Sequence, residues 1–233
     1  MIDQSTDNGR IVAAALALAA ERPWREVTLR DIAERAGVGL AGMRDVAGTK
    51  GEVLALFARQ IDDEVLANAP KPEPGEAKRD ALFEVVMARF DALAPYKPAL
   101  RSIMADGATD PALLRAMLSS QAWMLQAAGI DSGGVQGSVR VAGLASVYAS
   151  VARMWLDDDD PGLARTMAVL DRRLRRGERT LAAFDEVGNT VKRIGEGIAS
   201  LFAGASRAKP ADEAPSAAGP PPSKPAPDMP ISA

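Results

Sequence analysis

The sequence contains no cysteine and no histidine. These absences exclude disulfide bonds, thiol nucleophiles, zinc sites built from Cys and His, and imidazole acid–base chemistry. Aromatic residues make up only 4% of the chain, and no apolar run approaches the roughly 18 residues that a membrane-spanning helix needs. The N-terminal stretch MIDQSTDNGR is polar and acidic, unlike a secretion signal. We therefore expect a cytoplasmic protein.

The overall charge favours no particular partner. The 233 residues include 28 Lys and Arg against 31 Asp and Glu, which gives a net charge of -3. A composition of 47% hydrophobic and 25% charged residues is that of an ordinary globular protein with a sizeable core. No Ser/His/Asp, Cys/His or paired-carboxylate arrangement stands out, and no glycine-rich phosphate loop follows a strand. We expect a protein that is not an enzyme, with no catalytic residues, cofactor or metal.

Helical periodicity runs through the chain and strand signals are scarce, so the predicted fold class is all-α. A Pro-rich break at 69–76 divides an N-terminal unit from a second helical portion. We expect four parts, the last of which lacks the apolar content for a fold: a helix-turn-helix domain at 1–68, a helical domain at 76–186, an amphipathic helix at 187–204 and a disordered Ala/Pro-rich tail at 205–233.

The stretch VTLRDIAERAGVGLAGMRDVAGTKGEVLALF, residues 27–57, carries the clearest pattern. Thr28 with Asp31 resembles a capping box at a helix start, and Gly37 is a typical helix stop. A short second helix over 40–46 follows, and Thr49 with Glu52 forms a T-x-x-E box that opens a third helix. Two helices joined by a tight glycine turn can place the second one in the DNA major groove.

These residues resemble the N-terminal domain of the TetR family of bacterial regulators. The match rests on the T-x-x-x-I-A-x-x-A-G-V pattern and a following lysine, which are here Thr28, Ile32, Ala33, Ala36, Gly37, Val38 and Lys50. The resemblance implies a TetR-like fold, with an N-terminal three-helix helix-turn-helix unit and a C-terminal helical ligand-binding and dimerisation domain. It also implies a homodimeric DNA-binding transcriptional regulator that is controlled by a small apolar effector.

The resemblance assigns DNA contacts to seven residues: Thr28, Arg30, Leu40, Gly42, Arg44, Asp45 and Lys50. The recognition helix departs from the family pattern, because Gly39, Arg44 and Ala47 replace the usual Ser or Thr, phosphate-contacting aromatic and core Phe. Residues 1–59 also carry eight basic and eight acidic side chains, whereas DNA affinity normally needs a basic face. A helix-turn-helix that is kept as a folding unit without DNA binding is therefore a second interpretation.

The same resemblance implies a cavity in the second domain, lined by aromatic and methionine side chains, since methionine adapts readily to apolar ligands. The candidate ligand-binding residues are Met87, Phe90, Met104, Met117, Trp123, Met124, Tyr148 and Trp155. At helical spacing most of these residues are equally expected in an ordinary core.

A second resemblance covers 154–174, MWLDDDDPGLARTMAVLDRRL. This segment is similar to the C-terminal part of the coenzyme Q biosynthesis accessory family through Trp155, Asp157, Pro161, Thr166, Leu170, Asp171, Arg173 and Leu174. That family implies a TetR-like fold that needs no DNA, an isoprenoid ligand and a terminal helix at the membrane, for which 187–204 is the candidate. The alternative function is a lipid-binding accessory protein of ubiquinone biosynthesis.

Two charged runs have simple structural interpretations. The acidic run 157–160 precedes Pro161, so we expect it to cap a helix that begins there and extends to about 185, in preference to binding a metal. The arginines between 172 and 179 are expected on a solvated helix face, although contact with anionic lipid or with a partner is an alternative. The apolar stripe within 187–203 is expected to dock on its own domain, a dimer mate or a membrane surface.

Overall fold

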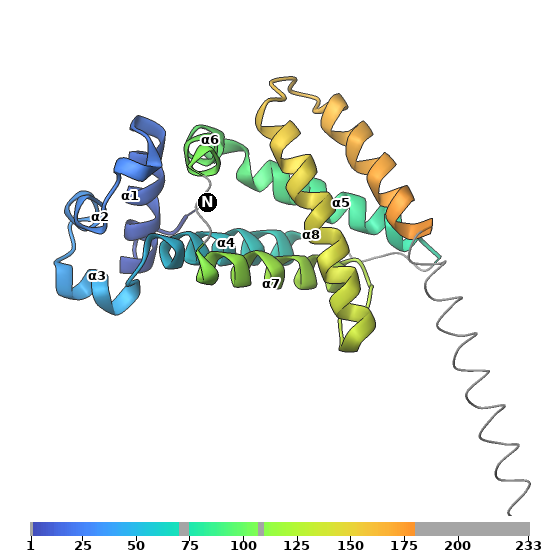
Figure 1. Ribbon diagram of the computed structural model, residues 1–233, viewed down its shortest axis with the longest axis horizontal. Helices are drawn as coiled ribbons and strands as arrows, with labels where there is room; N and C mark the ends of the chain where they lie inside the picture. The colour runs from blue at the N-terminus through green and yellow to red at the C-terminus, as the bar shows by residue number, and fades with distance from the viewer. Residues whose placement is uncertain (1, 70–74, 107–109, 180–233) are drawn as a thin grey trace, which may run out of the picture. The chain divides into compact units, whose positions relative to one another are not determined.

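The computed structural model describes residues 2–69, 75–106 and 110–179, and every regular element within these ranges is helical (Figure 1). This confirms the all-α fold class. Contacts divide the chain into two compact units, Met1–Asp185 and Glu186–Ala233. The second unit lies outside the described residues, as do the predicted amphipathic helix and tail. None of the described helices is long and apolar enough to cross a membrane.

The N-terminal part of the first unit contains the predicted helix-turn-helix. Its elements are α1 (Asp7–Glu21), the short 3-10 helix η1 (Trp24–Glu26), α2 (Leu29–Ala36), α3 (Leu40–Val46) and α4 (Lys50–Asn68). α1 packs against α2 and α4. Its buried face includes Ile11, Val12 and Ala15, which recur at helical spacing.

The remaining elements are α5 (Lys78–Leu93), the 3-10 helix η2 (Ala94–Tyr96), α6 (Lys97–Ala105), α7 (Pro111–Ala127), α8 (Gly134–Leu156) and a helix over 164–179. α7 lies alongside α4, and Figure 1 shows the two helices side by side. α7 also contacts α5 and α8, whereas α6 packs against α1 and α8. α4 therefore connects the helix-turn-helix with the C-terminal helices.

The local signals around the helix-turn-helix are confirmed. The Thr28 side chain accepts from the backbone N–H of Asp31, and the Asp31 carboxylate accepts from that of Thr28, so the capping box is complete. Gly37 ends α2 in the left-handed conformation with φ 67°, which a glycine adopts without steric cost. At α4 the predicted box is half formed. Thr49 accepts from the Glu52 N–H, but the Glu52 carboxylate accepts from the Gly48 N–H.

Pro98 lies within the first turn of α6, where its missing N–H is not needed. One predicted boundary is wrong. The helix expected from Pro161 begins at 164 instead. Pro161 and Gly162 form a turn, because the Asp160 carboxylate accepts from the N–H groups of Gly162 and Ala164.

One hydrophobic core runs through both parts of the first unit. At the N-terminal end it buries Trp24, Ile32 and Met43, and in the C-terminal helices it buries Phe90 and Trp155. Since the core is continuous, the helix-turn-helix is not an independent module on a linker, and its position depends on the packing of α4 and α6.

Candidate nucleic-acid interface and ligand core

Charged pairs fix α2 on the end of α1. Arg22, which follows α1, lies 2.6 Å from the Asp31 carboxylate in the first turn of α2. Arg35 in the last turn of α2 makes two hydrogen bonds to the Glu21 carboxylate, of 2.9 and 2.5 Å. Two arginines of the N-terminal unit are therefore paired within the protein, so fewer cations are available to contact DNA phosphates.

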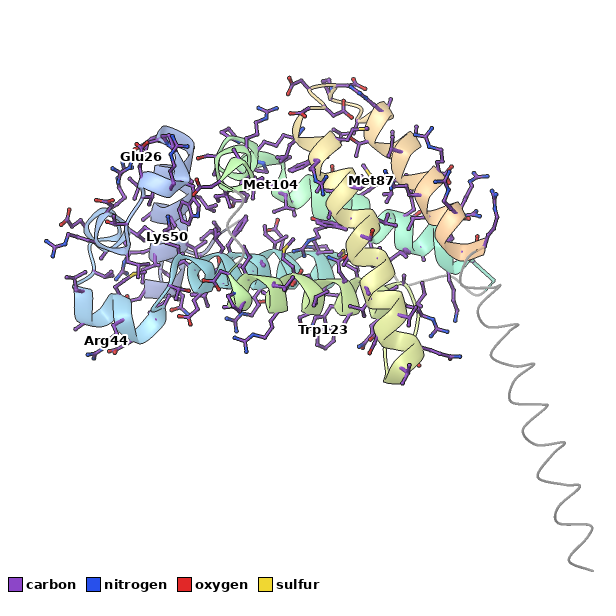
Figure 2. The ribbon with its side chains drawn as sticks, viewed as in Figure 1. Glu26, Arg44, Lys50, Met87, Met104 and Trp123 are labelled. Atoms are coloured by element: carbon purple, nitrogen blue, oxygen red, sulfur yellow. The ribbon has the colours of Figure 1, made fainter. Side chains whose placement is uncertain are left out.

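The exposed face of the recognition helix α3 consists of Leu40, Ala41, Arg44 and Asp45, and Met43 is buried beneath it. Leu40 is 53% exposed. Figure 2 shows Arg44 on the outer side of α3, where its guanidinium lies 3.2 Å from the Asp45 carboxylate. The face therefore presents one cation, one anion and the apolar side chains of Leu40 and Ala41. Gly42 is partly buried.

The other predicted DNA-contact residues lie at the starts of α2 and α4. Thr28 and Arg30 are exposed, but the Thr28 hydroxyl already serves as the cap of α2. The Lys50 ammonium faces the protein. It lies 4.7 Å from the Trp24 ring centre and donates a hydrogen bond of 2.7 Å to the Trp24 carbonyl. Arg30 and Arg44 are thus the most accessible cations among the seven predicted residues, and DNA contact stays a prediction for all of them.

Three of the eight candidate ligand residues form one aromatic stack. The Phe90 ring lies between Tyr148 and Trp155, with both centre-to-centre distances 5.1 Å. All three rings are buried, as is Met124, and Met87 and Met117 are partly buried against the same core. Burial raises the pKa of Tyr148 above its ordinary value, so its hydroxyl stays protonated.

Met104 and Trp123 do not join this group. Both are exposed, by 43% and 49%, and Figure 2 shows them on α6 and α7. Two adjoining cavities of about 290 and 340 Å³ lie beside α1 and α6 and share Ala20 and Pro98 in their walls. None of the eight candidate residues lines either of them. The ligand-binding role of the eight residues stays a prediction.

A buried polar cluster adjoins the aromatic stack, and sequence reasoning missed it. The Arg89 guanidinium, 2% exposed, donates to the Asp62 carboxylate, to the Tyr148 hydroxyl at 3.2 Å and to the Ser120 hydroxyl at 3.3 Å. Ser120 in turn donates to Asp62 at 2.6 Å. The four side chains come from α5, α4, α8 and α7, so one cluster joins four helices.

A sequence signal for this cluster was available. Asp62 occupies the buried stripe of α4 between Ala58 and Val65, and Arg89 occupies that of α5 between Val85 and Leu93. Charged residues are almost never fully buried unless they are paired. One acid and one base at apolar-face positions of consecutive helices therefore predict an ion pair.

The acidic run 157–160 stabilises the turn before the helix over 164–179. The Asp158 carboxylate accepts from the Thr166 hydroxyl at 2.6 Å and from its backbone N–H at 3.0 Å, and both residues are buried. The Thr166 hydrogen bonds hold the pKa of Asp158 below its ordinary value. Within the part of the chain that the structure describes, no group of three or more acidic side chains is placed to hold a metal ion.

α6 is tied to this turn. Lys97 donates to the Asp158 carbonyl at 2.6 Å and lies 4.7 Å from the Trp155 ring centre, and Arg101 donates to the Leu156 carbonyl. On its other side the Ser102 hydroxyl accepts from the Trp24 N–H at 3.0 Å. α6 therefore touches both the helix-turn-helix and the aromatic stack.

The helix over 164–179 carries the predicted arginine cluster. Arg175 pairs with Asp171, and Arg79 of α5 pairs with Glu178. Arg172, Arg173 and Arg179 are exposed. This agrees with the expectation of a solvated helix face.

Comparison with known proteins gives two family matches. Residues 11–47 match the family described as "Bacterial regulatory proteins, tetR family", and residues 114–180 match the COQ9 family. No curated protein matches the chain. The first match runs from within α1 to the end of α3, and the second covers most of α7, all of α8 and the following helix.

Solved structures share the fold. A TetR transcriptional regulator from Rhodococcus sp. RHA1 superposes with a TM-score of 0.59 at 19% identity, covering 75% of this chain and 96% of that one. One from Nitrosomonas europaea ATCC 19718 gives 0.55 at 23% identity, with coverage of 73% and 97%. A tetR-family regulator from Streptomyces coelicolor gives 0.54 at 19% identity, with coverage of 86% and 98%. The chain therefore has a TetR-like fold, with an N-terminal segment that matches the tetR family and a C-terminal segment that matches the COQ9 family.

Proposed function

We propose that the protein is a homodimeric, TetR-type DNA-binding transcriptional regulator, controlled by a small apolar effector. The observation that carries this proposal is the intact helix-turn-helix, in which a fully capped α2 and the left-handed Gly37 present the outer face of α3 to solvent. That arrangement allows a short second helix to enter a DNA major groove. A regulator of this kind acts in the cytoplasm.

The cations available to DNA are few, which shapes the expected affinity. Arg44 is 77% exposed along its side chain and Arg30 is exposed at the start of α2. Each phosphate contact contributes to the salt dependence of binding, and a guanidinium can also read a guanine edge. We expect a modest salt slope, because the opposing carboxylates Glu34 and Asp45 lie on the same helices.

The effector would act by population shift. A ligand in the C-terminal helices would favour a conformation in which the two recognition helices of the dimer no longer match the half-site spacing. The buried aromatic stack of Phe90, Tyr148 and Trp155 supports an apolar or aromatic ligand, since such a ligand could pack against these rings.

Fluorescence anisotropy with a labelled duplex from upstream of the protein's own gene tests the proposal. The wild type should bind this duplex at least tenfold more tightly than a shuffled duplex at 150 mM salt, a ratio still below those of established specific binders. Arg44→Ala should weaken binding and lower the salt slope by about one unit. Lys78→Ala, which removes an exposed cation at the start of α5, is the matched control. Equal affinity for both duplexes would contradict specific binding.

The match to the COQ9 family over residues 114–180 favours a second candidate function. In this alternative the protein is a lipid-binding accessory protein of ubiquinone biosynthesis that does not bind DNA. The apolar, charge-balanced face of α3 is consistent with it. The isoprenoid ligand would occupy the C-terminal helices, and 187–204 would make a peripheral membrane contact.

Mass spectrometry of the organic extract of the purified protein distinguishes this alternative. An isoprenoid lipid that co-purifies in near-stoichiometric amount, together with no preference for the upstream duplex, would support it. Detergent-washed protein that retains no lipid and still selects the upstream duplex would support the regulator.

A further inference from the structure

We propose that Tyr148, Arg89 and Asp62 form a relay that positions the helix-turn-helix by holding α4 against the C-terminal helices α5 and α8. The inference deepens the proposed function, because it assigns the contact through which events in the core would reach the DNA-binding end. Tyr148 and Arg89 are positioning residues in this account.

α4 is anchored by polar groups at two well separated points. At its first residue, Lys50 holds Trp24 of the helix-turn-helix unit through a hydrogen bond and a cation–π contact. Twelve positions later, Asp62 is held by Arg89 and Ser120 in the core. At a rise of about 1.5 Å per residue the two anchors are about 18 Å apart along one helix. A displacement of Asp62 therefore moves the helix that holds Trp24.

The core end of the relay reaches the aromatic stack. Arg89 donates to the Tyr148 hydroxyl at 3.2 Å, and the Tyr148 ring is stacked on Phe90, which is stacked on Trp155. A ligand that displaces the Tyr148 ring would move its hydroxyl, and Arg89 would then lose one of its three partners. This loss would destabilise the folded state, because a buried charged donor that lacks a hydrogen-bond partner costs free energy.

The cluster is buried and closely paired, which suits a two-state contact. Arg89, Asp62 and Tyr148 are all less than a tenth exposed. Packed interiors switch between discrete arrangements in preference to deforming continuously. The relay would accordingly either hold α4 or release it.

Hydrogen exchange of the full chain, read by mass spectrometry in the absence of any ligand, tests the relay. Tyr148→Phe keeps the ring and removes only the hydroxyl. We expect amide exchange in residues 24–46, which lie in the helix-turn-helix and not beside Tyr148, to accelerate roughly threefold to tenfold, the factor that corresponds to one lost hydrogen bond.

Ser150→Ala is the matched control, because it also removes one buried hydroxyl from α8, but one that lies outside the relay. It should leave exchange in 24–46 unchanged. Acceleration confined to α7 and α8 in Tyr148→Phe, or equal acceleration of 24–46 in both variants, would overturn the relay.

A DNA arm separates this inference from the proposed function. If the wild type binds its upstream duplex, Tyr148→Phe should change the Kd by roughly threefold to tenfold, and Ser150→Ala should not. A wild type without DNA affinity would defeat the proposed function, whereas the exchange experiment would still decide the relay.

Discussion

The Lys50 ammonium lies over the Trp24 ring, 4.7 Å from its centre, and bonds the carbonyl oxygen of the same residue at 2.7 Å. This contact joins the first residue of α4 to the 3-10 helix that precedes α2. Lys50, which the TetR pattern predicts at the DNA interface, therefore stabilises the packing of α4 against η1 within the protein.

Replacing this lysine should destabilise the protein whether or not it binds DNA. We expect Lys50→Met to lower the free energy of unfolding by about 1–2 kcal/mol, since a cation–π contact and a charged hydrogen bond are lost. Urea denaturation measures the change. Lys78→Met, at an exposed position, should leave the free energy of unfolding within about 0.5 kcal/mol. Equal midpoints for the two variants would show that the Trp24 contact contributes nothing.

The buried ion pair should show strong coupling in a double-mutant cycle. Asp62→Leu or Arg89→Met alone should lower the free energy of unfolding by about 3–5 kcal/mol, because each leaves an uncompensated buried charge. The double variant should recover most of that loss, because two apolar side chains can pack in the same space. Additive losses in denaturant unfolding would mean that the two groups do not depend on each other.

Much of the helix-turn-helix could be predicted because its signals are local. Thr28, Asp31 and Gly37 act within one or two turns, so their spacing alone identifies the ends of α2. The burial of the candidate ligand residues was harder to predict. Met104 and Trp123 have the same helical spacing as their buried neighbours, but they are exposed, since periodicity does not say which face another helix covers. The pairing of Asp62 with Arg89 depends on how α4 and α5 pack.

Two glycines near the recognition helix should respond oppositely to alanine. At Gly42 an added Cβ meets no atom within 4 Å, so Gly42→Ala should stabilise the protein by up to about 1 kcal/mol. At Gly37 the φ of 67° strains any residue with a Cβ, so Gly37→Ala should cost about 1–2 kcal/mol. Thermal melts of both variants provide the comparison. A destabilising Gly42→Ala would mean that α3 is not helical at that residue.

The turn at Asp158 should contribute to acid sensitivity. Thr166 lowers the pKa of Asp158 from 3.8 in the folded state. A depressed folded-state pKa stabilises the protein above the unfolded pKa, and this stabilisation is lost as the pH falls through the folded value. Thr166→Val should therefore lower the free energy of unfolding at pH 6 and flatten its decline below about pH 4. Parallel pH profiles for wild type and variant would exclude Asp158 as a contributor.

The proposed function requires that the exposed face of α3 reads DNA. Selection of bound fragments from a genomic DNA library by the full-length protein, followed by sequencing, tests it most directly. We expect enrichment of a palindromic site whose half-sites lie about one helical turn, roughly 10 base pairs, or a multiple apart, as a twofold dimer requires. Arg44→Ala should reduce that enrichment and Lys78→Ala should preserve it. No enriched sequence over the input library, at any salt concentration that keeps the protein folded, would contradict the claim.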